Sequence, residues 1–197
     1  MAERLLCLVR HAEVVLRGDV HPSEWELSPQ GRSDARDLGR AREWQSVDAV
    51  VASPEAKTRQ TAEPIAEAAG VELRLVEELR EVERGLSGLV SAQEYAALVE
   101  AHFALPDESV AGWERGADAR TRVATAIDAL AEETSGNLCV VSHGMVLSHY
   151  LAHLRGLETP PIEEWRAIPL PAVAVVDPDE RRLVRPFVSG RHFIGLA

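Results

Sequence analysis

Short apolar runs alternate along this chain with longer segments in which apolar residues recur at helical spacing. Each run is bounded by turn or loop residues, which is typical of a strand. The intervening segments carry helix signals, such as Ser28-Pro29 at the start of one and Gly70 at the end of another that begins at Pro54. The runs that we predict to be strands are residues 4–9, 48–52, 71–76, 138–142, 172–177 and 181–187.

This alternation of strands and helices predicts an α/β protein with a mostly parallel sheet. Residues 71–76 alternate apolar and polar side chains, which favours a half-buried edge strand. Asp177-Pro178-Asp179 is a turn signal between the last two strands. We therefore expect these two strands to form an antiparallel hairpin at the edge of the sheet.

The strand–helix rhythm is interrupted between residues 84 and 115. Ser91 and Glu94 have the spacing of a capping box, which predicts a helix that runs through Phe103. Because such an excursion is suited to covering a ligand crevice, we interpret residues 84–115 as a helical lid. With 197 residues, 46% of them hydrophobic, and no internal repeat, residues 1–197 are expected to form a single domain.

The charge balance narrows the choice of partners. A formal net charge of -11 argues against nucleic acid or an anionic membrane surface as the main partner. No apolar run approaches membrane-spanning length, and the N-terminal residues lack the pattern of a secretory signal. Cys7 and Cys139 fall in predicted buried strands, and a disulfide between them requires that those strands be neighbours. We expect reduced thiols and a cytoplasmic location.

Two histidines follow predicted core strands. Arg10-His11 comes after residues 4–9, and Ser142-His143-Gly144 comes after residues 138–141. The ligand crevice of an α/β protein lies beyond the carboxyl ends of its parallel strands, so both imidazoles are expected at one edge. One histidine at such a place is usually a packed or capping residue, but core packing alone does not call for two.

These residue types suit phosphoester hydrolysis without a metal, which needs a nucleophile, cations for the phosphoryl oxygens and an acid for the leaving group. A neutral His11 can attack phosphorus, while Arg10 and a proton-bearing His143 act as donors. Nearby cations disfavour protonation of His11 and so keep its ring neutral, which a nucleophile requires. Any phosphate-bearing ligand must then be held by a local cationic pocket.

Four ordered blocks resemble the successive motifs of the histidine phosphatase superfamily, the phosphoglycerate-mutase-like fold. Their order and spacing match over most of the chain. The blocks are Arg10-His11-Ala12-Glu13, Ser53-Pro54 with Gln60-Thr61-Ala62-Glu63, Leu79-Arg80-Glu81, and Ser142-His143-Gly144.

The resemblance implies a three-layer α/β/α sandwich and roles for several residues. His11 is implied to become transiently phosphorylated, Arg10 and His143 to bind the transferred group, and Glu81 to protonate the leaving oxygen and then activate water. Among nearby acids, Glu81 is preferred over its rivals because Leu79-Arg80-Glu81 with Gly85 matches the spacing of the family. The rivals are Glu77, Glu78 and Glu83.

The chain departs from the family pattern at two positions. Lys57 stands where the family usually has an arginine that binds phosphate, and Arg59 lies roughly 200° further around the helix. The position in the motif favours Lys57 as the phosphate ligand, whereas the bidentate hydrogen bonding of a guanidinium favours Arg59. A third possibility is that Lys57 is only a solvated helix residue. Arg17 stands where many members have an asparagine, and it is either a phosphate ligand or a surface residue. Ser142 is expected to shape the turn or cap the next helix.

The leading functional hypothesis is metal-independent hydrolysis of a small phosphomonoester through a phosphohistidine on His11, with no cofactor. His149 and His153 are four residues apart on a predicted helix, but no third metal ligand is suggested. The alternatives are a phosphoglycerate mutase and a catalytically weak phosphate-binding regulatory module. The sequence identifies neither the phosphorylated substrate nor the oligomeric state.

Overall fold

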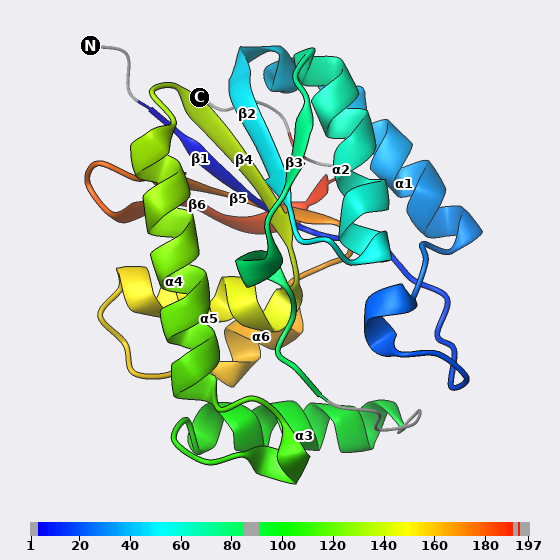
Figure 1. The fold of residues 1–197 in the computed structure, drawn as a ribbon, viewed down its shortest axis with the longest axis vertical. Helices are drawn as coiled ribbons and strands as arrows, with labels where there is room; N and C mark the ends of the chain where they lie inside the picture. The colour runs from blue at the N-terminus through cyan, green and yellow to red at the C-terminus, as the bar shows by residue number, and fades with distance from the viewer. Residues whose placement is uncertain (1–3, 85–90, 191–192, 194–197) are drawn as a thin grey trace.

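The fold is built on one six-stranded sheet with the strand order β3-β2-β4-β1-β5-β6 (Figure 1). The computed structural model describes residues 4–84, 91–190 and 193. Strands β3, β2, β4 and β1 are parallel to one another. β5 pairs antiparallel with β1, and β6 pairs antiparallel with β5. The predicted edge hairpin and the edge position of β3 are therefore confirmed. The strands are β1 (Leu6–Arg10), β2 (Val47–Ala52), β3 (Leu73–Leu75), β4 (Asn137–Ser142), β5 (Ala172–Asp177) and β6 (Arg182–Ser189).

Helices cover both faces of this sheet, and the predicted three-layer architecture is confirmed. Side chains alternate across β1, with Leu6 and Leu8 packed into one core and Cys7 and Val9 into the other. The first core is covered mainly by α4 and α5, with α3 packed at its end, and the second by α1 and α2. The helices are α1 (Pro29–Gly39), α2 (Ala56–Ala69), α3 (Ala92–Ala104), α4 (Gly116–Glu133), α5 (Gly144–Leu154) and α6 (Ile162–Ala167).

The helix caps explain where the two helices next to the site begin. Ser28 caps α1 as expected, since its side chain accepts a hydrogen bond from the backbone of Gly31. The second helix begins at Ala56 rather than Pro54, because Glu55 still has an extended backbone with φ −61° and ψ 142°. Glu55 is therefore the N-cap residue of α2. Gly70 ends this helix with a φ of 70°, in the left-handed region that glycine adopts without strain.

Several short elements were not predicted. Besides α6, there are single 3₁₀ turns, which are too short to leave a periodic pattern in the sequence. They are η1 (Pro22–Glu24), η2 (Arg42–Ser46), η3 (Glu77–Leu79) and η4 (Val110–Gly112).

The two cysteines are direct neighbours across β1 and β4. Cys7 is paired with Cys139 in the register of these strands, and both are buried, free thiols. Burial raises the pKa of the Cys7 thiol to about 12. The strands thus meet the condition for a disulfide, but the residues pack as small hydrophobic side chains.

The segment interpreted as a lid contains α3, which begins at the predicted Ser91–Glu94 capping box. Val99, His102 and Phe103 bury one side of this helix against the core. Residues 85–90 of the segment, and with them Gly85 of the third motif, lie outside the described residues. That α3 opens and closes over a ligand stays a prediction.

No helix among the described residues is both long and apolar enough to cross a membrane.

Candidate active site

His11 and His143 meet because their strands are parallel neighbours. Arg10 of β1 lies in register with Ser142 of β4, so the next residue of each strand emerges at the same edge of the sheet. The two imidazole rings lie edge to face, with centroids 5.3 Å apart. His11 is 8% exposed and His143 is fully buried. The predicted convergence of the two histidines is present in the structure.

One hydrogen bond sets the tautomer of His11. Its Nδ1 lies 2.7 Å from the backbone oxygen of Ala12. A carbonyl oxygen only accepts, so Nδ1 carries the proton and Nε2 keeps its lone pair. Burial, reinforced by His143 and then by the charge of Lys57, holds the pKa of His11 well below its usual value. The ring is therefore neutral at neutral pH and has a free nitrogen, as a nucleophile needs.

Residues of the second motif support the loop that carries His11. Thr61 Oγ1 accepts a hydrogen bond from the backbone of Ala12 at 3.0 Å and donates to the backbone oxygen of Lys57 at 2.8 Å. Gln60 Oε1 accepts a hydrogen bond from the backbone of Leu27 at 2.9 Å. These contacts fix α2 against the loops at the end of β1, which explains why the motif carries this polar pair.

His143 faces the first turn of α2. Its Nε2 lies 2.9 Å from Ser53 Oγ and 3.3 Å from Glu55 Oε1. Burial, followed by the charges of Lys57 and Arg84, holds the pKa of His143 well below its usual value. Because an ionised carboxylate only accepts, Nε2 is the protonated nitrogen of this neutral ring. His143 can thus donate one hydrogen bond without carrying a charge.

Arg10 packs closely against the backbone that follows His143. Its Nη1 donates to the backbone oxygen of Ile168 at 2.5 Å, whereas its buried Nε has no hydrogen-bond partner among the described residues. A Cβ atom at Gly144 would lie 3.1 Å from both Nε and Cζ of Arg10. A larger residue at this position would push the guanidinium away, which explains the glycine of the last motif.

Glu81 lies at the N-terminus of α5. Its carboxylate accepts hydrogen bonds from the backbone of Val82 at 3.0 Å and of Met145 and Val146 at 3.3 Å each. Burial nevertheless raises the pKa of Glu81, although the charge of Arg84 opposes this. A carboxyl group with a raised pKa can hold a proton and donate it, which fits an acid role.

The structure separates Glu81 from its rivals. Glu77 and Glu78 are exposed, and Glu83 is 3.5 Å from His21 at the pocket rim.

Ser142 helps to position Glu81, which the sequence did not predict. Its Oγ donates to the backbone oxygen of Leu79 at 2.7 Å and so ties β4 to the segment that carries Glu81. It does not cap α5, whose N-cap residue is His143.

Lys57 and Arg59 point in different directions from α2. Lys57 is only 3% exposed, its Nζ donates to the backbone oxygen of Pro22 at 2.7 Å, and it forms an ion pair with Glu55. The side chain of Arg59 is 49% exposed and lies 3.7 Å from Glu63. The structure therefore brings Lys57 to the histidines and leaves Arg59 at the rim of the pocket.

Arg17 is not brought to the other site residues. It lies on an exposed loop, where it forms an ion pair with Asp19, and its backbone oxygen accepts a hydrogen bond from Trp25 Nε1 at 2.8 Å. A carboxylate two residues along the chain thus holds the guanidinium locally.

Two further charged residues of the site were not assigned a role from the sequence. Glu55 contacts both Lys57 and His143. Arg84 lies with its guanidinium carbon 5.3 Å from the centre of the Tyr95 ring, and its charge acts on Glu81 and His143. The position of Glu55 directly after Ser53-Pro54 is a signal in the second motif, but an acid at a helix start is also an ordinary N-cap residue.

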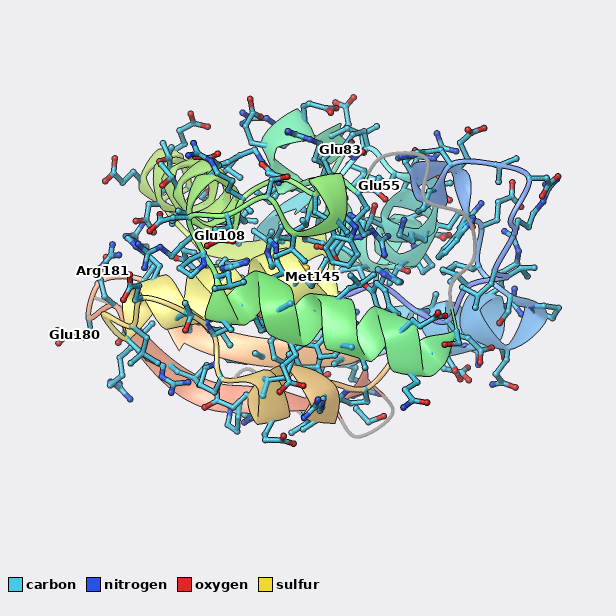
Figure 2. The ribbon with its side chains drawn as sticks, turned by 90° about the horizontal axis from the view of Figure 1, so that it is seen from below. Glu55, Glu83, Glu108, Met145, Glu180 and Arg181 are labelled. Carbon is cyan, nitrogen blue, oxygen red and sulfur yellow. The ribbon has the colours of Figure 1, made fainter. Side chains whose placement is uncertain are left out.

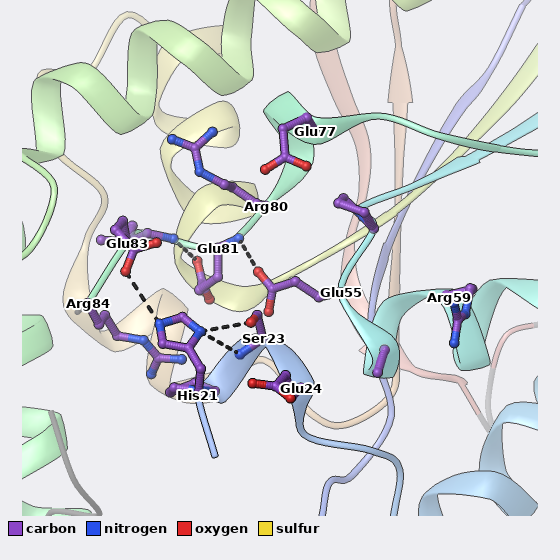
Figure 3. A pocket seen from close by; sticks show the side chains of 14 residues that line it. His21, Ser23, Glu24, Glu55, Arg59, Glu77, Arg80, Glu81, Glu83 and Arg84 are labelled. Carbon is purple, nitrogen blue, oxygen red and sulfur yellow. Dashed lines mark hydrogen bonds and ion pairs between the residues drawn. The ribbon is translucent and has the colours of Figure 1, made fainter. Parts of the chain in front are cut away.

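A pocket of about 510 Å³ opens beside these groups (Figure 3). Glu55 and Glu81 lie side by side in its wall, and the carboxylate of Glu55 accepts a hydrogen bond from the backbone of Glu81 at 2.9 Å. Figure 2 shows Glu55 and Glu83 together on the side of the molecule away from the hairpin residues Glu180 and Arg181. The acidic and basic residues that line the pocket are His21, Glu24, Glu55, Arg59, Glu77, Arg80, Glu81, Glu83 and Arg84.

In the described part of the chain, no three or more His, Cys, Asp or Glu residues are grouped as metal ligands. His149 and His153 also have separate partners. The Nε2 of His149 lies 3.0 Å from that of His102, and the Nε2 of His153 lies 3.4 Å from Asp128.

A parallel α/β sheet with two neutral imidazoles, an arginine and a lysine at its carboxyl edge is the arrangement of an enzyme that handles phosphate groups. Residues 6–185 match the family model described as "Histidine phosphatase superfamily (branch 1)". The chain therefore belongs to the histidine phosphatase superfamily, and it is an enzyme of the phosphomonoesterase type. No curated protein matches the sequence of the chain.

Solved structures with low sequence identity share the fold. Bacillus stearothermophilus YhfR has a TM-score of 0.75 and 22% identity, with 95% of this chain and 99% of that chain covered. A putative alpha-ribazole-5'-P phosphatase from Escherichia coli has a TM-score of 0.74 and 21% identity, with 99% and 100% covered. A mycobacterial glucosyl-3-phosphoglycerate phosphatase has a TM-score of 0.68 and 23% identity, with 88% and 89% covered.

Proposed function

We propose that this protein hydrolyses a small phosphate monoester through a phosphohistidine intermediate on His11. The observation that carries the proposal is the hydrogen bond from Nδ1–H of His11 to the backbone oxygen of Ala12. It leaves the lone pair of Nε2 on a buried ring with a lowered pKa. A nucleophilic histidine needs this combination of neutrality and fixed orientation.

In the first step, Nε2 of His11 forms a bond to phosphorus while the bond from phosphorus to the ester oxygen breaks. Glu81, whose raised pKa favours the protonated form, gives its proton to the departing oxygen. In the second step, a water oxygen attacks phosphorus and its proton passes to the Glu81 carboxylate. The phosphorus–nitrogen bond then breaks, its electron pair returns to Nε2, and inorganic phosphate leaves.

Three side chains are assigned to the phosphoryl oxygens. The Nε–H of Arg10 is a buried donor with no partner among the described residues, so a phosphoryl oxygen can accept from it. Lys57 supplies a buried positive charge and His143 a neutral N–H donor. Donors fixed in a buried site stabilise the charge of the transition state more strongly than donors in water.

The proposed chemistry uses side chains alone, so it predicts activity without a metal ion. The leaving group is not identified, because related folds occur in a putative alpha-ribazole-5'-P phosphatase and in a glucosyl-3-phosphoglycerate phosphatase. Hydrolysis and a mutase reaction differ in the acceptor of the phosphoryl group, and the pocket wall carries both the carboxylates of Glu24, Glu77 and Glu83 and the guanidinium groups of Arg59, Arg80 and Arg84.

The test is phosphate release from a panel of phosphorylated metabolites and an aryl phosphate, in the presence and absence of excess chelator. We expect release at nearly the same rate with and without chelator. Loss of activity on chelation and its recovery with Mg²⁺ would reject the metal-free assignment. Interconversion of 2- and 3-phosphoglycerate with little phosphate released would favour a mutase, and tight phosphate binding without turnover would favour a regulatory module.

A further inference from the structure

The carboxylate of Glu55 is bound by three groups that also suit a phosphoryl oxygen. Its Oε2 pairs with Lys57 Nζ, and its Oε1 lies 3.3 Å from His143 Nε2 and 2.9 Å from the backbone nitrogen of Glu81. These are a lysine cation, an imidazole N–H and a backbone N–H. Phosphate oxygens are held in proteins by these same donor types.

Glu55 is charged in this position. Burial by itself would raise its pKa, but the charge and hydrogen bond of Lys57 outweigh burial and hold the pKa below its usual value. The negative charge that compensates Lys57 in the structure therefore comes from the chain itself. His11 is near enough that its protonated form would lower the pKa of Glu55 as well, so the carboxylate lies within the group of residues assigned to phosphate transfer.

A phosphate group and an ionised Glu55 would compete for these contacts. If phosphate oxygens accept from Lys57 and His143, they lie next to the carboxylate that now accepts from both, and like charges at such short range repel strongly. The carboxylate must then turn away or take up a proton. The 510 Å³ pocket, in whose wall Glu55 lies, provides space for the side chain to turn (Figure 3).

We propose that Glu55 is an intramolecular anion that occupies part of the phosphate position in the free enzyme and competes there with phosphate. This inference rests on the proposed function, because that function defines the phosphate position. The competition weakens binding of inorganic phosphate, the product, and so favours its release. It also makes Glu55 a residue that determines how strongly the site discriminates between free phosphate and an ester with further contacts in the pocket.

The test measures binding of inorganic phosphate by isothermal titration calorimetry. Glu55→Gln removes the charge but keeps an oxygen that can accept from the backbone of Glu81. We expect the Kd for phosphate to fall by at least about tenfold, since juxtaposed like charges weaken binding strongly. Glu67→Gln is the matched control, because it removes an exposed carboxylate of the same helix that does not line the pocket. Its Kd should stay within about twofold of the wild-type value.

Glu55→Ala provides a second variant in case the amide disturbs folding, and it should shift the Kd in the same direction. Thermal unfolding checks that each protein is folded. If the wild type binds phosphate and both Glu55 variants have an unchanged or higher Kd, this proposal alone is overturned. That result would indicate that Glu55 merely positions Lys57. No phosphate binding by any of the proteins, together with no turnover of any ester, overturns the proposed function and this proposal with it.

Discussion

The imidazole rings of His11 and His143 lie edge to face, with centroids 5.3 Å apart and an angle of 65° between the ring planes. This pairing follows from the parallel register of β1 and β4, which places the residue after each strand at the same edge. His143 contributes, after burial, to lowering the pKa of His11. Two buried imidazoles at this distance do not both take up a proton readily, which keeps the nucleophile neutral.

The nucleophile can be tested directly. Replacing His11 with alanine removes the attacking nitrogen, so turnover of an aryl phosphate should fall by at least about 10⁴-fold. Rapid quenching of wild type with a labelled substrate should trap an acid-labile phosphoprotein that the variant lacks. His153→Ala changes a more exposed histidine at another place in the fold and should retain near-wild-type turnover. Substantial activity in folded His11→Ala would show that another group attacks phosphorus.

The pH dependence of kcat/KM follows from two shifted pKa values. His11 must be neutral, so activity is lost as pH falls through its pKa, which lies well below 6.5. Glu81 must be protonated for the first step, so activity is lost as pH rises through its pKa, which is raised above 4.5. The activity range should thus extend unusually far into acid, as a pH series with a stable substrate can measure.

Glu81→Gln separates the acid role from simple packing. Glutamine cannot protonate the departing oxygen, so kcat for an alkyl phosphate should fall by about 10²-fold or more and its basic pH limb should disappear. The loss should be smaller for an aryl phosphate, whose leaving group needs little protonation. Glu78→Gln, at an exposed acid nearby, serves as the control. Equal losses for both substrates would argue against proton donation by Glu81.

Substitutions of Lys57 and Arg59 should differ in their effect on kcat/KM, although the two residues are close in sequence. Lys57→Ala removes a buried cation beside the histidines and should lower kcat/KM by about 10²-fold or more. Arg59→Ala removes an exposed side chain and should change kcat/KM by less than about tenfold. Lys57→Arg should retain much of the activity, since the family accommodates arginine there. The reverse order of the two alanine variants would identify Arg59 as the phosphate ligand.

A buried histidine pair predicts acid sensitivity of folding. His102 on α3 and His149 on α5 lie with their Nε2 atoms 3.0 Å apart, and burial lowers the pKa of both, that of His149 to about 3. The charge of Glu114 favours the protonated form of His102. The protonated form of His149 is disfavoured by His102, Arg120 and Arg122. The unfolded chain binds protons below about pH 6.5 and the folded chain does not.

The stabilising contribution of His149 is therefore complete above pH 6.5 and decreases as pH falls towards 3. Between pH 7 and pH 5, the free energy of unfolding should decrease by about 2 kcal/mol less in His149→Gln than in wild type. Urea titrations at the two pH values measure this difference. His153→Gln, at a less buried histidine of the same helix, should preserve the wild-type dependence. A parallel pH dependence of wild type and His149→Gln would contradict the assignment.

Local patterns were sufficient to predict much of the fold and part of the site. Apolar runs and cap residues identified all six strands, with strand ends within two residues of those observed, and the helices α1, α2 and α3. The meeting of His11 and His143 was also predictable, because parallel core strands end at one edge of a sheet. The sequence left the choice between Lys57 and Arg59 open, because motif register favours the lysine and guanidinium chemistry the arginine; only the structure shows that Lys57 is buried near the histidines and Arg59 is exposed.

The contacts that depend on packing between distant segments were decided only by the tertiary structure. Nothing local to Glu55 shows that its carboxylate reaches His143, because that contact arises from the register of β2 against β4. The pairing of His102 with His149 likewise depends on how α3 packs on α5. Arg17 is held by Asp19 in an exposed loop whose course no periodic pattern records. Sequence periodicity reports which face of an element is buried, whereas the partners across a buried interface are selected by the packing of the whole chain.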